Sequence, residues 1–261
     1  MGKTPLIINN MEEKKGLIIG MRALDEALES GKEIEKILFK AGLEGVQFRQ
    51  LCDKLRTMGI PYQFVPVEKL NYLSKGNHQG VVAKISVIEY VSVEKIIDKA
   101  LSGEGIPLVV LLDGVSDVRN FGAIARSAEC SGAAGIILPA KGGAAINTDS
   151  IKSSAGALLR LPVARVTNLR IAIYLLKESG FMIAGADEKA EQSIYDVDFR
   201  KPCAVVMGSE DKGISDSVKT LLDQKGRIPL LGNIGSLNVS AAAAVILFEA
   251  VRQRGAEIQN K

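Results

Sequence analysis

The sequence predicts an α/β fold, and three observations indicate it. The 261 residues are 47% hydrophobic and 24% charged, which is typical of a globular protein with a substantial core. From Pro107 onward, short apolar runs alternate with helical patterns, as they do in βαβ units. The first of these runs, "PLVVLLDGV", is apolar throughout, as expected for a strand of a parallel sheet covered on both faces. We therefore expect an open parallel sheet with helices on both faces, preceded by a smaller α/β domain.

Residues 1–90 are expected to form the smaller domain. Apolar residues recur there at helical spacing, for example Met21, Leu24 and Leu28. In chain order we expect a short start and a helix in "GLIIGMRALDEALESG", a strand in "EKILFK", a helix in "VQFRQLCDKLRTMGI", a strand in "PYQFVP", a short helix in "VEKLNYLSKG" and a strand in "GVVAKISVI". Residues 91–106 follow as a linker, which contains a short helix and the flexible sequence "SGEG".

Residues 107–261 carry the long alternation of strands and helices. After the first strand, the expected strands are "AGIILP", "LPVARV", "FMIAGAD", "PCAVVMGSE" and "GRIPLL". The expected helices are "NFGAIARSAECSG", "TDSIKSSAGALLR", "NLRIAIYLLKESG", "ISDSVKTLLDQ" and "SAAAAVILFEAV". The last helix is apolar around most of its circumference, which indicates burial on more than one side and favours a homodimer.

Composition and charge narrow the class of protein. A net charge of +3 is too small to identify a nucleic-acid-binding protein by itself. Cys52, Cys130 and Cys203 are scattered without a CxxC pair, which favours buried thiols in a reducing compartment over disulfides or a zinc site. No metal-spaced cluster of histidine and cysteine occurs, and no apolar run reaches the roughly 18 residues of a membrane span. Since the N-terminus also lacks the apolar core of a signal peptide, we expect a cytoplasmic protein without a metal.

The loops that follow the strands are the expected functional region, because ligands of open parallel sheets bind beyond the carboxyl ends of the strands. The loops of interest are "DGVSDVRNFG", "MGSEDKG" and "LGNIGSLN". No GxGxxG follows the first strand and no GxxxxGK[ST] occurs, so motifs do not support a nucleotide-dependent oxidoreductase or a phosphate-loop enzyme. The single histidine, His78, fits a loop residue bonded to nearby backbone better than a catalytic base.

Each of the three loops also has an ordinary structural explanation. Asn120 stands at a helix start and can cap it, whereas Arg126 can be either a solvated residue or a bidentate clamp for a phosphate. Glu210 lies in a glycine-containing segment that can be a simple turn. In the third loop, Gly232 and Gly235 allow backbone to approach a ligand closely. The polar side chains of that loop are Ser236 and Asn238.

Together the three loops resemble the motifs of the SPOUT methyltransferases, specifically the TrmH/SpoU family of RNA 2′-O-ribose methyltransferases. The matching stretches, in the family's order, are "NFGAIAR", "VVMGSEDKGIS" and "IPLLGNIGSLNVSAAAAVILFEA". Residues 1–90, including "NHQGVVA", resemble the L30e-like RNA substrate-binding domain that precedes such a catalytic domain. The arrangement is most similar to enzymes that methylate a guanosine in large-subunit ribosomal RNA. The alternatives are transfer RNA as substrate and a non-catalytic RNA-binding protein on the same scaffold.

The resemblance implies a SPOUT fold and a cofactor for residues 107–261. It implies a deep trefoil knot whose loops bind S-adenosyl-L-methionine, and a homodimer whose active site uses both subunits. The small residues of Leu231–Ser240 then let neighbouring segments pass closely and hold the cofactor with backbone groups. The cofactor-binding residues carried over by the resemblance are Gly208, Gly213, Ile228, Pro229, Gly232 and Leu237.

The resemblance also implies a catalytic set: Asn120, Arg126, Glu210, Ser236 and Asn238. Two roles are open for Arg126. Because a guanidinium is effectively always protonated, we favour a grip on the phosphate beside the target ribose, so that phosphate or solvent takes the proton of the 2′-hydroxyl. The alternative is that the site favours the neutral form of Arg126 strongly enough for it to act as the base. Asn120 is expected to position Arg126 or the ribose, and Glu210 to orient the nucleotide or Arg126. Ser236 and Asn238 are expected to contact RNA or to fix the cofactor loop.

A basic stretch is consistent with ribosomal RNA as the partner. Between Asp149 and Glu178 no acidic residue occurs. The basic residues there are Lys152, Arg160, Arg165, Arg170 and Lys177. Contacts to RNA phosphates and ordinary solvated helix faces both account for such a stretch.

Overall fold

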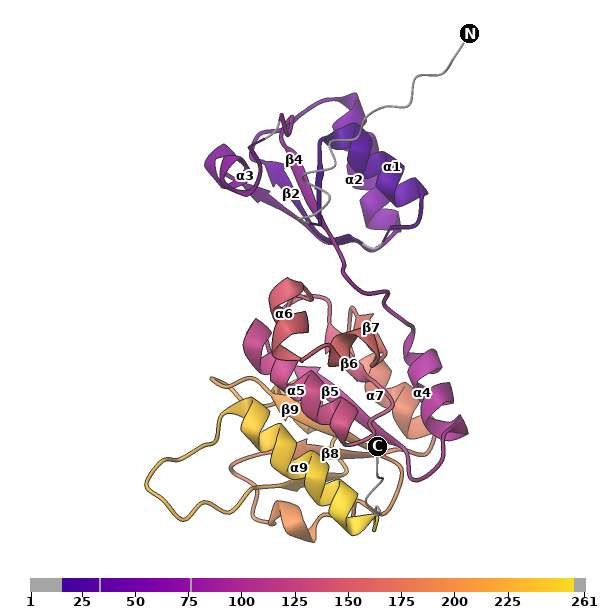
Figure 1. Cartoon of the computed structure of the whole chain (residues 1–261), viewed down its shortest axis with the longest axis vertical. Coiled ribbons are helices and arrows are strands. Elements are labelled where there is room, and N and C mark those ends of the chain that lie inside the picture. The colour runs from indigo at the N-terminus through magenta and orange to yellow at the C-terminus, as the bar shows by residue number, and fades with distance from the viewer. Residues whose placement is uncertain (1–15, 33, 76, 256–261) are drawn as a thin grey trace. The chain divides into compact units, whose positions relative to one another are not determined.

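The computed structural model describes residues 16–32, 34–75 and 77–255, and the chain divides into two units, Met1–Glu89 and Tyr90–Lys261. Each unit has its own sheet and its own helices (Figure 1). The expected α/β class and the parallel sheet of the second unit are confirmed. The expectation that the N-terminus is not a signal peptide falls on residues 1–15, which lie outside the described residues.

The first unit contains a four-stranded mixed sheet in the order β1-β4-β2-β3. Its elements are β1 (Leu17–Ile19), α1 (Met21–Glu29), β2 (Ile34–Lys40), α2 (Val46–Thr57), β3 (Tyr62–Val65), α3 (Val67–Leu73) and β4 (Val81–Ile85). Only the β2–β3 pair is parallel. Helices α1 and α2 cover one face of the sheet and α3 covers the other (Figure 1). Leu24 and Leu51 are buried on the first face, and Leu70 is buried on the second.

The second unit contains a six-stranded parallel sheet in the order β10-β8-β9-β5-β6-β7. The strands are β5 (Leu108–Asp113), β6 (Ile136–Pro139), β7 (Val163–Val166), β8 (Met182–Ala186), β9 (Cys203–Gly208) and β10 (Gln224–Gly226). The α-helices are α4 (Val93–Ser102), α5 (Val118–Cys130), α6 (Thr148–Ser153), α7 (Leu169–Glu178), α8 (Asp216–Lys219) and α9 (Val239–Gln253). Helices α4 and α7 pack on one face, whereas α5 and α9 pack against each other on the opposite face (Figure 1). The deep trefoil knot stays a prediction.

The segment interpreted as a linker is part of the second unit. Helix α4 fills most of residues 91–106 and buries Val93, Ile96 and Ile97 in the same apolar core as the strands. Residues at i, i+3 and i+4 form one apolar helix face, and such a face is stabilised by burial. The chain divides after Glu89, one residue from the expected end of the first domain, whereas residues 91–106 and the sequence "SGEG" lie within the second unit and do not form a linker.

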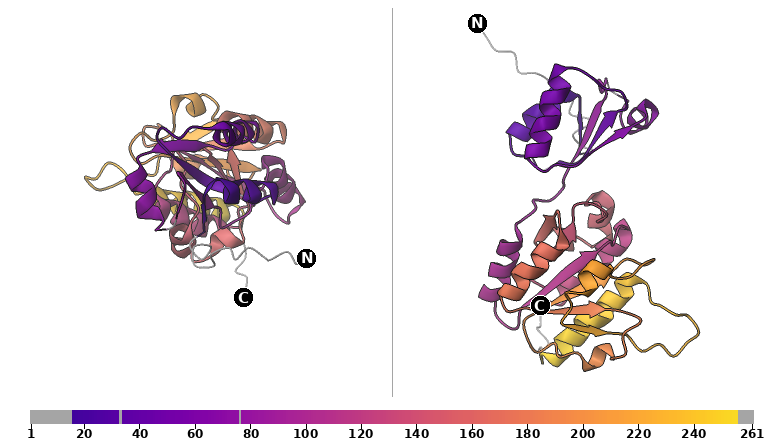
Figure 2. Two further views of the ribbon diagram at one scale, coloured as in Figure 1. Left: turned by 90° about the horizontal axis from the view of Figure 1, so that it is seen from above. Right: turned by 180° about the vertical axis from the view of Figure 1, so that it is seen from behind.

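The segment expected to be the last strand also differs. Strand β10 spans Gln224–Gly226 and pairs with β8, whereas "GRIPLL" was expected to form it. The chain from Ile228 to Leu237 is instead a long loop that extends away from the sheet (Figures 1 and 2). Leu231 is fully exposed and Ile234 is 80% exposed in this loop. Leu230 and Leu231, which belong to the expected strand, therefore lie at the surface of the single chain.

The cysteines differ in exposure. All three are free thiols, Cys52 and Cys203 being buried and Cys130 exposed, so the expectation of buried thiols was wrong for Cys130. Its position at the last residue of α5 places the side chain in solvent. Burial raises the pKa of the Cys203 thiol to about 11. Burial also raises the pKa of the Cys52 thiol above its usual value.

We expect iodoacetamide at pH 8 to alkylate Cys130 of the native protein and to spare the other two cysteines. The thiolate is the reacting form, and a buried thiol of raised pKa supplies little of it. Mass spectrometry of tryptic peptides measures the modification at each cysteine, and alkylation in denaturant is the control. Equal labelling of Cys203 and Cys130 in the native protein would contradict the packing described here.

Candidate functional site

Three of the predicted catalytic residues meet at the carboxyl edge of the sheet. Asn120 comes from the first turn of α5, Glu210 from the loop after β9, and Asn238 from the residue before α9. The Nδ2 of Asn238 donates to Oδ1 of Asn120 at 3.0 Å and to Oε1 of Glu210 at 2.6 Å. Because a charge-assisted hydrogen bond is short and strong, the bond to Glu210 fixes this contact most firmly. One amide thus joins three segments that are remote in sequence.

The same amide also begins a helix. Asn238 is the N-cap of α9, and its Oδ1 accepts from the backbone N–H of Ser240 at 2.9 Å and from the Ser240 hydroxyl at 2.6 Å. An N-cap side chain satisfies an N–H group that has no partner within the helix. Asn238 therefore uses its oxygen for the helix and its nitrogen for the other two residues. Asparagine suits this position because its carboxamide carries both a hydrogen-bond acceptor and a hydrogen-bond donor.

Asn120 is free to join this network because another residue caps α5. The carboxylate of Asp117 accepts from the backbone N–H groups of Arg119 at 2.9 Å and of Asn120 at 2.8 Å. The alternative that Asn120 caps the helix was therefore wrong. Asp117 and Asn120 are equally suitable N-cap residues, so the sequence pattern alone did not show which of the two caps the helix.

A cavity of about 330 Å³ adjoins the network. Seven of the predicted site residues line it: Gly208, Glu210, Gly213, Ile228, Ser236, Leu237 and Asn238. Pro229 and Gly232, expected beside the cofactor, are not among the lining residues. A neighbouring hollow of about 340 Å³ is lined by Asn120 and Glu210 and also by Lys212.

Two predicted cofactor glycines have a packing reason to be glycine. A side chain on Gly208 would overlap the backbone of Gly213 and Ile214, because the chain folds back over this position. Ser209 and Gly213 exchange two backbone hydrogen bonds, of 2.9 and 3.0 Å, and close this turn. Gly213 has φ +65°, which favours glycine. These two residues thereby shape the turn that carries Glu210.

The glycines of the third loop have no such reason within the described residues. A Cβ at Gly232 or at Gly235 would meet no atom within 4 Å. The expectation that small residues there let segments of the chain pass closely was therefore wrong for these two positions in the single chain. Gly235 does line the cavity, so the absence of a side chain leaves that wall open.

Arg126 stands apart from the network. It lies on α5, six residues after Asn120, which is about 9 Å further along the helix axis and on a different side. Its side chain is exposed and forms no hydrogen bond or ion pair with the described residues. It lines neither the cavity nor the neighbouring hollow. The structure thus joins Asn120, Glu210 and Asn238 and leaves Arg126 free.

Sequence reasoning missed two features of the site. Asp113, the last residue of β5, accepts from the backbone N–H of Ser215 at 2.7 Å and so ties β5 to the segment after Glu210. Asp187 and Glu188, which follow β8, line the cavity. Asp113, Asp187 and Glu188 each lie at the carboxyl end of a strand. The rule that ligands bind beyond these ends of a parallel sheet could therefore have identified all three residues.

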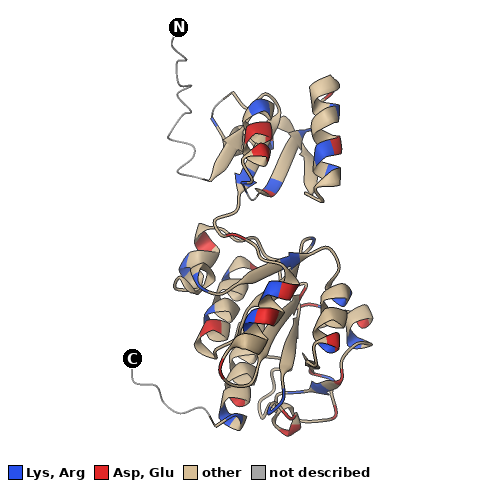
Figure 3. Cartoon of the chain, turned by 90° about the vertical axis from the view of Figure 1, so that its right-hand side faces the viewer, with Lys and Arg blue, Asp and Glu red and all other residues tan. Residues whose placement is uncertain are grey.

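Charges of both signs surround the site. Lys212 and Arg227 line the cavity together with Asp187, whose carboxylate pairs with Lys219 at 3.5 Å. Basic and acidic residues likewise occur side by side on helices of both units (Figure 3). No group of three or more metal-ligating side chains occurs within the described ranges. No helix among the described residues is long and apolar enough to cross a membrane.

Two members of the basic stretch have partners within the protein. Arg165 lies over the ring of Tyr90, with its guanidinium carbon 4.5 Å from the ring centroid, and Lys177 pairs with Asp223 at 2.6 Å. Arg160 and Arg170 are exposed. The stretch is therefore partly structural, and its exposed members remain candidates for phosphate contacts.

Comparison with known proteins matches both units to families. Residues 107–248 match the SpoU rRNA Methylase family, and residues 17–91 match the family described as RNA 2′-O ribose methyltransferase substrate binding. The chain is 37% identical over 238 residues to a Staphylococcus haemolyticus protein assigned to the TrmH family of tRNA/rRNA methyltransferases. That similarity covers 91% of this chain and 96% of the relative.

Two solved structures are similar to this chain. The SpoU methyltransferase AviRb from Streptomyces viridochromogenes, in complex with the cofactor AdoMet, has a TM-score of 0.58 and 30% identity, and 94% of each chain is covered. The TrmH/SpoU tRNA modifying enzyme from A. aeolicus has a TM-score of 0.54 and 30% identity, with 62% of this chain and 82% of that chain covered.

Proposed function

The chain belongs to the SpoU/TrmH family of RNA methyltransferases, and on that premise we propose that it methylates the ribose 2′-hydroxyl of a guanosine in large-subunit ribosomal RNA. Its cofactor is S-adenosyl-L-methionine, the AdoMet of the AviRb complex. The observation that carries the proposal is the Asn120–Asn238–Glu210 network beside a cavity at the carboxyl edge of the sheet.

The cavity fits this cofactor chemically. Its volume of about 330 Å³ lies within the range of roughly 300–1,000 Å³ that small-molecule pockets occupy. Ile228 and Leu237 offer apolar walls, while Asp187 and Glu188 place carboxylates at the same cavity. When bound, the cofactor supplies an electrophilic methyl group on a cationic sulfur, a charge that neighbouring carboxylates favour. We propose Gly208, Gly213, Ile228 and Leu237 as its contacts in this chain.

The chain's own residues then position the RNA. Glu210 uses Oε1 to accept from Asn238, which leaves its second oxygen to accept from a nucleotide. We infer that Arg126 grips the phosphate beside the target ribose, because a guanidinium presents two parallel donors to a phosphate. With the cofactor bound, the bond from its methyl group to sulfur would break as the O–C bond forms, a neutral thioether would leave, and the proton of the 2′-hydroxyl would pass to phosphate or water. Ser236, exposed at the cavity, contacts RNA or the cofactor loop.

A homodimer is part of this proposal, and we expect light scattering at micromolar concentration to give about twice the 27.9 kDa chain mass. Leu231 and Ile234 of the third loop and Phe248 of α9 are exposed apolar side chains in the single chain. We propose that these side chains are buried in the interface between the two subunits. Phe248→Glu should shift the protein toward monomer, and a fully active monomeric wild type would rule the dimer out.

Mixing two inactive variants tests whether the active site uses both subunits. If Arg126 of one protomer serves Glu210 of the other, each mixed dimer of Arg126→Ala with Glu210→Ala contains one intact site. Equal mixing with exchange of subunits should then restore about a quarter of wild-type activity. No restoration, with mixed dimers shown by mass spectrometry, would place both residues in a site of one protomer.

Ribosomal RNA is preferred over transfer RNA because residues 17–91 match a substrate-binding family and the A. aeolicus tRNA enzyme covers only 62% of this chain. The relative from Staphylococcus haemolyticus is described with both substrates, which keeps transfer RNA as the second candidate. Unmodified transcripts of both RNAs, given labelled cofactor, separate the two. We expect incorporation into large-subunit ribosomal RNA, and incorporation into transfer RNA alone would overturn the finer assignment.

A further inference from the structure

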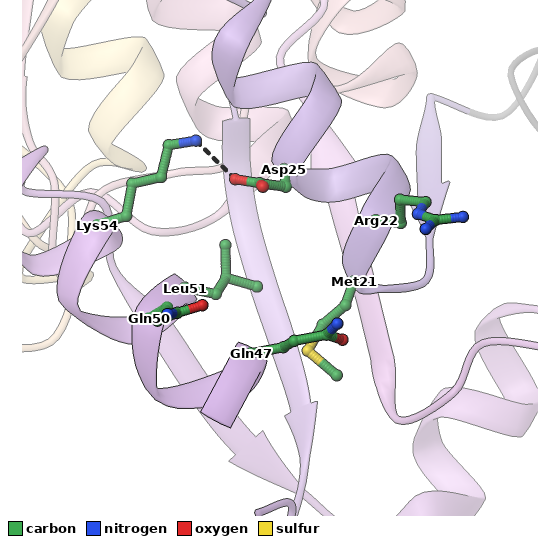
Figure 4. Close-up of a pocket in the computed structure, with 7 residues that line it drawn as sticks. All are labelled: Met21, Arg22, Asp25, Gln47, Gln50, Leu51 and Lys54. Atoms are coloured by element: carbon green, nitrogen blue, oxygen red, sulfur yellow. Dashed lines mark hydrogen bonds and ion pairs between the residues drawn. The ribbon is translucent and has the colours of Figure 1, made fainter. Parts of the chain in front are cut away.

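A polar groove between α1 and α2 of the first unit lies outside the site described above. It has a volume of about 350 Å³ and is drawn in Figure 4. We propose that this groove binds an unpaired nucleotide of the substrate RNA and reads the edge of its base with Gln47 and Gln50. The proposal rests on the proposed function for the identity of the RNA, and it adds the place where the first unit recognises it.

One wall of the groove is a stripe of polar side chains on α2. Gln47, Gln50 and Lys54 follow one another at i, i+3 and i+7, so they lie along one side of the helix. The other wall is the start of α1, with Met21 and Asp25 (Figure 4). Leu51, which lies between Gln50 and Lys54 on α2 and also lines the groove, is buried in the core of the first unit. Its burial anchors α2 to the rest of the unit.

Two charged residues of the groove, Asp25 and Lys54, are paired with each other. The Nζ of Lys54 lies 2.6 Å from Oδ1 of Asp25 and 3.3 Å from Oε1 of Glu29, so one ammonium joins α2 to two carboxylates of α1. The hydrogen bond to Asp25 is the main cause that raises the pKa of Lys54. These pairs hold the two helices in register and leave the groove near electrical neutrality. A neutral polar groove suits a base better than it suits a bare phosphate.

The two glutamines are free to bind a ligand. Both side chains are exposed, and neither forms a hydrogen bond with the described residues. A carboxamide carries a donor and an acceptor side by side, which is the pattern of a base edge, and glutamine pairs with adenine through two hydrogen bonds. Met21 offers an apolar surface against which a flat base can pack. Exposed Arg22 at the same groove has no ion pair within the described ranges and can contact the adjoining phosphate.

Binding of the full chain to labelled twelve-residue single strands of A, C, G or U tests the groove. We expect at least one of these four RNAs to bind about tenfold more tightly than the weakest, since a two-bond base contact discriminates to that degree. The double variant Gln47→Ala/Gln50→Ala should remove this discrimination. Gln63→Ala is the matched control, because Gln63 is an exposed glutamine of the same unit outside the groove. Equal binding of all four RNAs by the wild type would overturn the proposal.

The salt dependence of the same binding separates base from phosphate contacts. The glutamine variants should keep the wild-type slope of log K against log [salt], because no charge is lost. Arg22→Ala should reduce that slope by about 0.7, the value for one phosphate contact on a single strand. Arg49→Ala removes an exposed arginine of α2 that does not line the groove, so it should leave the slope unchanged. Equal effects of the two arginine variants would mean that the unit binds RNA by diffuse charge, and the groove assignment would be wrong.

Methyl transfer by the same variants keeps this inference separate from the proposed function. We expect the glutamine double variant to raise KM for RNA and to leave kcat unchanged, with an unaltered thermal unfolding midpoint. A wild type that discriminates among the four RNAs but methylates none would refute the function and leave the groove intact. A wild type that methylates RNA, with a double variant of unchanged KM and unchanged discrimination, would refute the groove alone.

Discussion

Arg126→Ala is expected to lower the single-turnover rate of methyl transfer by about 10²–10³-fold, or ~3–4 kcal/mol of transition-state stabilisation. The side chain is exposed on α5 and has no partner among the described residues, so its removal should change stability by less than roughly 0.5 kcal/mol. Arg126→Ala should therefore lower the rate of methyl transfer without lowering the stability of the fold. Single-turnover measurement on saturating RNA isolates the chemical step from RNA binding and product release.

A conservative substitution at the same position and a control arginine variant help to interpret the rate of Arg126→Ala. Arg126→Lys should recover little of the rate, because an ammonium cannot reproduce the planar two-point grip on a phosphate. Arg49→Ala, which removes an exposed arginine of α2 in the first unit, should react at the wild-type rate. Binding of the cofactor, measured by calorimetry, should stay within about threefold of wild type for all three variants. If Arg126→Ala reacts as fast as wild type, Arg126 is a solvated surface residue and the phosphate grip is wrong.

Asn238→Asp is expected to lower the rate by roughly 10–100-fold while preserving stability, because it separates the two functions of this side chain. A carboxylate can still accept from the backbone N–H of Ser240 and cap α9. It cannot donate to Asn120 or Glu210, and it places a second negative charge against Glu210. A lost hydrogen bond to a charged group is worth about 1.5–3 kcal/mol, which sets the expected loss of rate.

Asn238→Ala completes the comparison. It loses the cap as well as the network, so it should also lower the free energy of unfolding by about 0.5–2 kcal/mol. Ser240→Ala removes the hydroxyl that donates to Oδ1 of Asn238 and leaves the network in place, so it is the control for local disturbance. Thermal unfolding and single-turnover rates measure both quantities for each variant. A wild-type rate for Asn238→Asp would show that the network has no role in the reaction.

The fold was predictable from the sequence where the patterns are local. The apolar runs of β5 and β9 and the spacing of apolar residues in α1 and α2 lead to the observed elements. The helix within residues 91–106 was predicted, but its packing in the second unit was not, because its apolar face has meaning only against the sheet that it covers. The last strand was misplaced because the apolar residues from Ile228 to Leu231 indicated a strand, whereas they begin a loop in which Leu230 and Leu231 are exposed.

The residues of the candidate site were predictable from the sequence, whereas the hydrogen bonds that connect them were not. Asn120, Glu210 and Asn238 come from three loops, and a spacing argument cannot reveal that one amide bonds to both partners. The structural reason for Gly208 is equally non-local, since the clashing atoms belong to a turn that returns from Gly213. The separation of Arg126 from this network could not be read from the motif, in which Asn120 and Arg126 are only six residues apart.

The central claim is methyl transfer to a ribose oxygen of RNA, and analysis of the methylated nucleosides tests it most directly. Unmodified RNA is incubated with the full chain and with cofactor carrying an isotopically labelled methyl group. The RNA is then digested to nucleosides, and mass spectrometry assigns the label to base or sugar. We predict label in 2′-O-methylguanosine, resistance of the adjoining phosphodiester bond to alkali, and about 10²–10³-fold slower labelling with Arg126→Ala. Label on a base, or no label in any RNA tested, would contradict the assigned reaction and the role of Arg126 together.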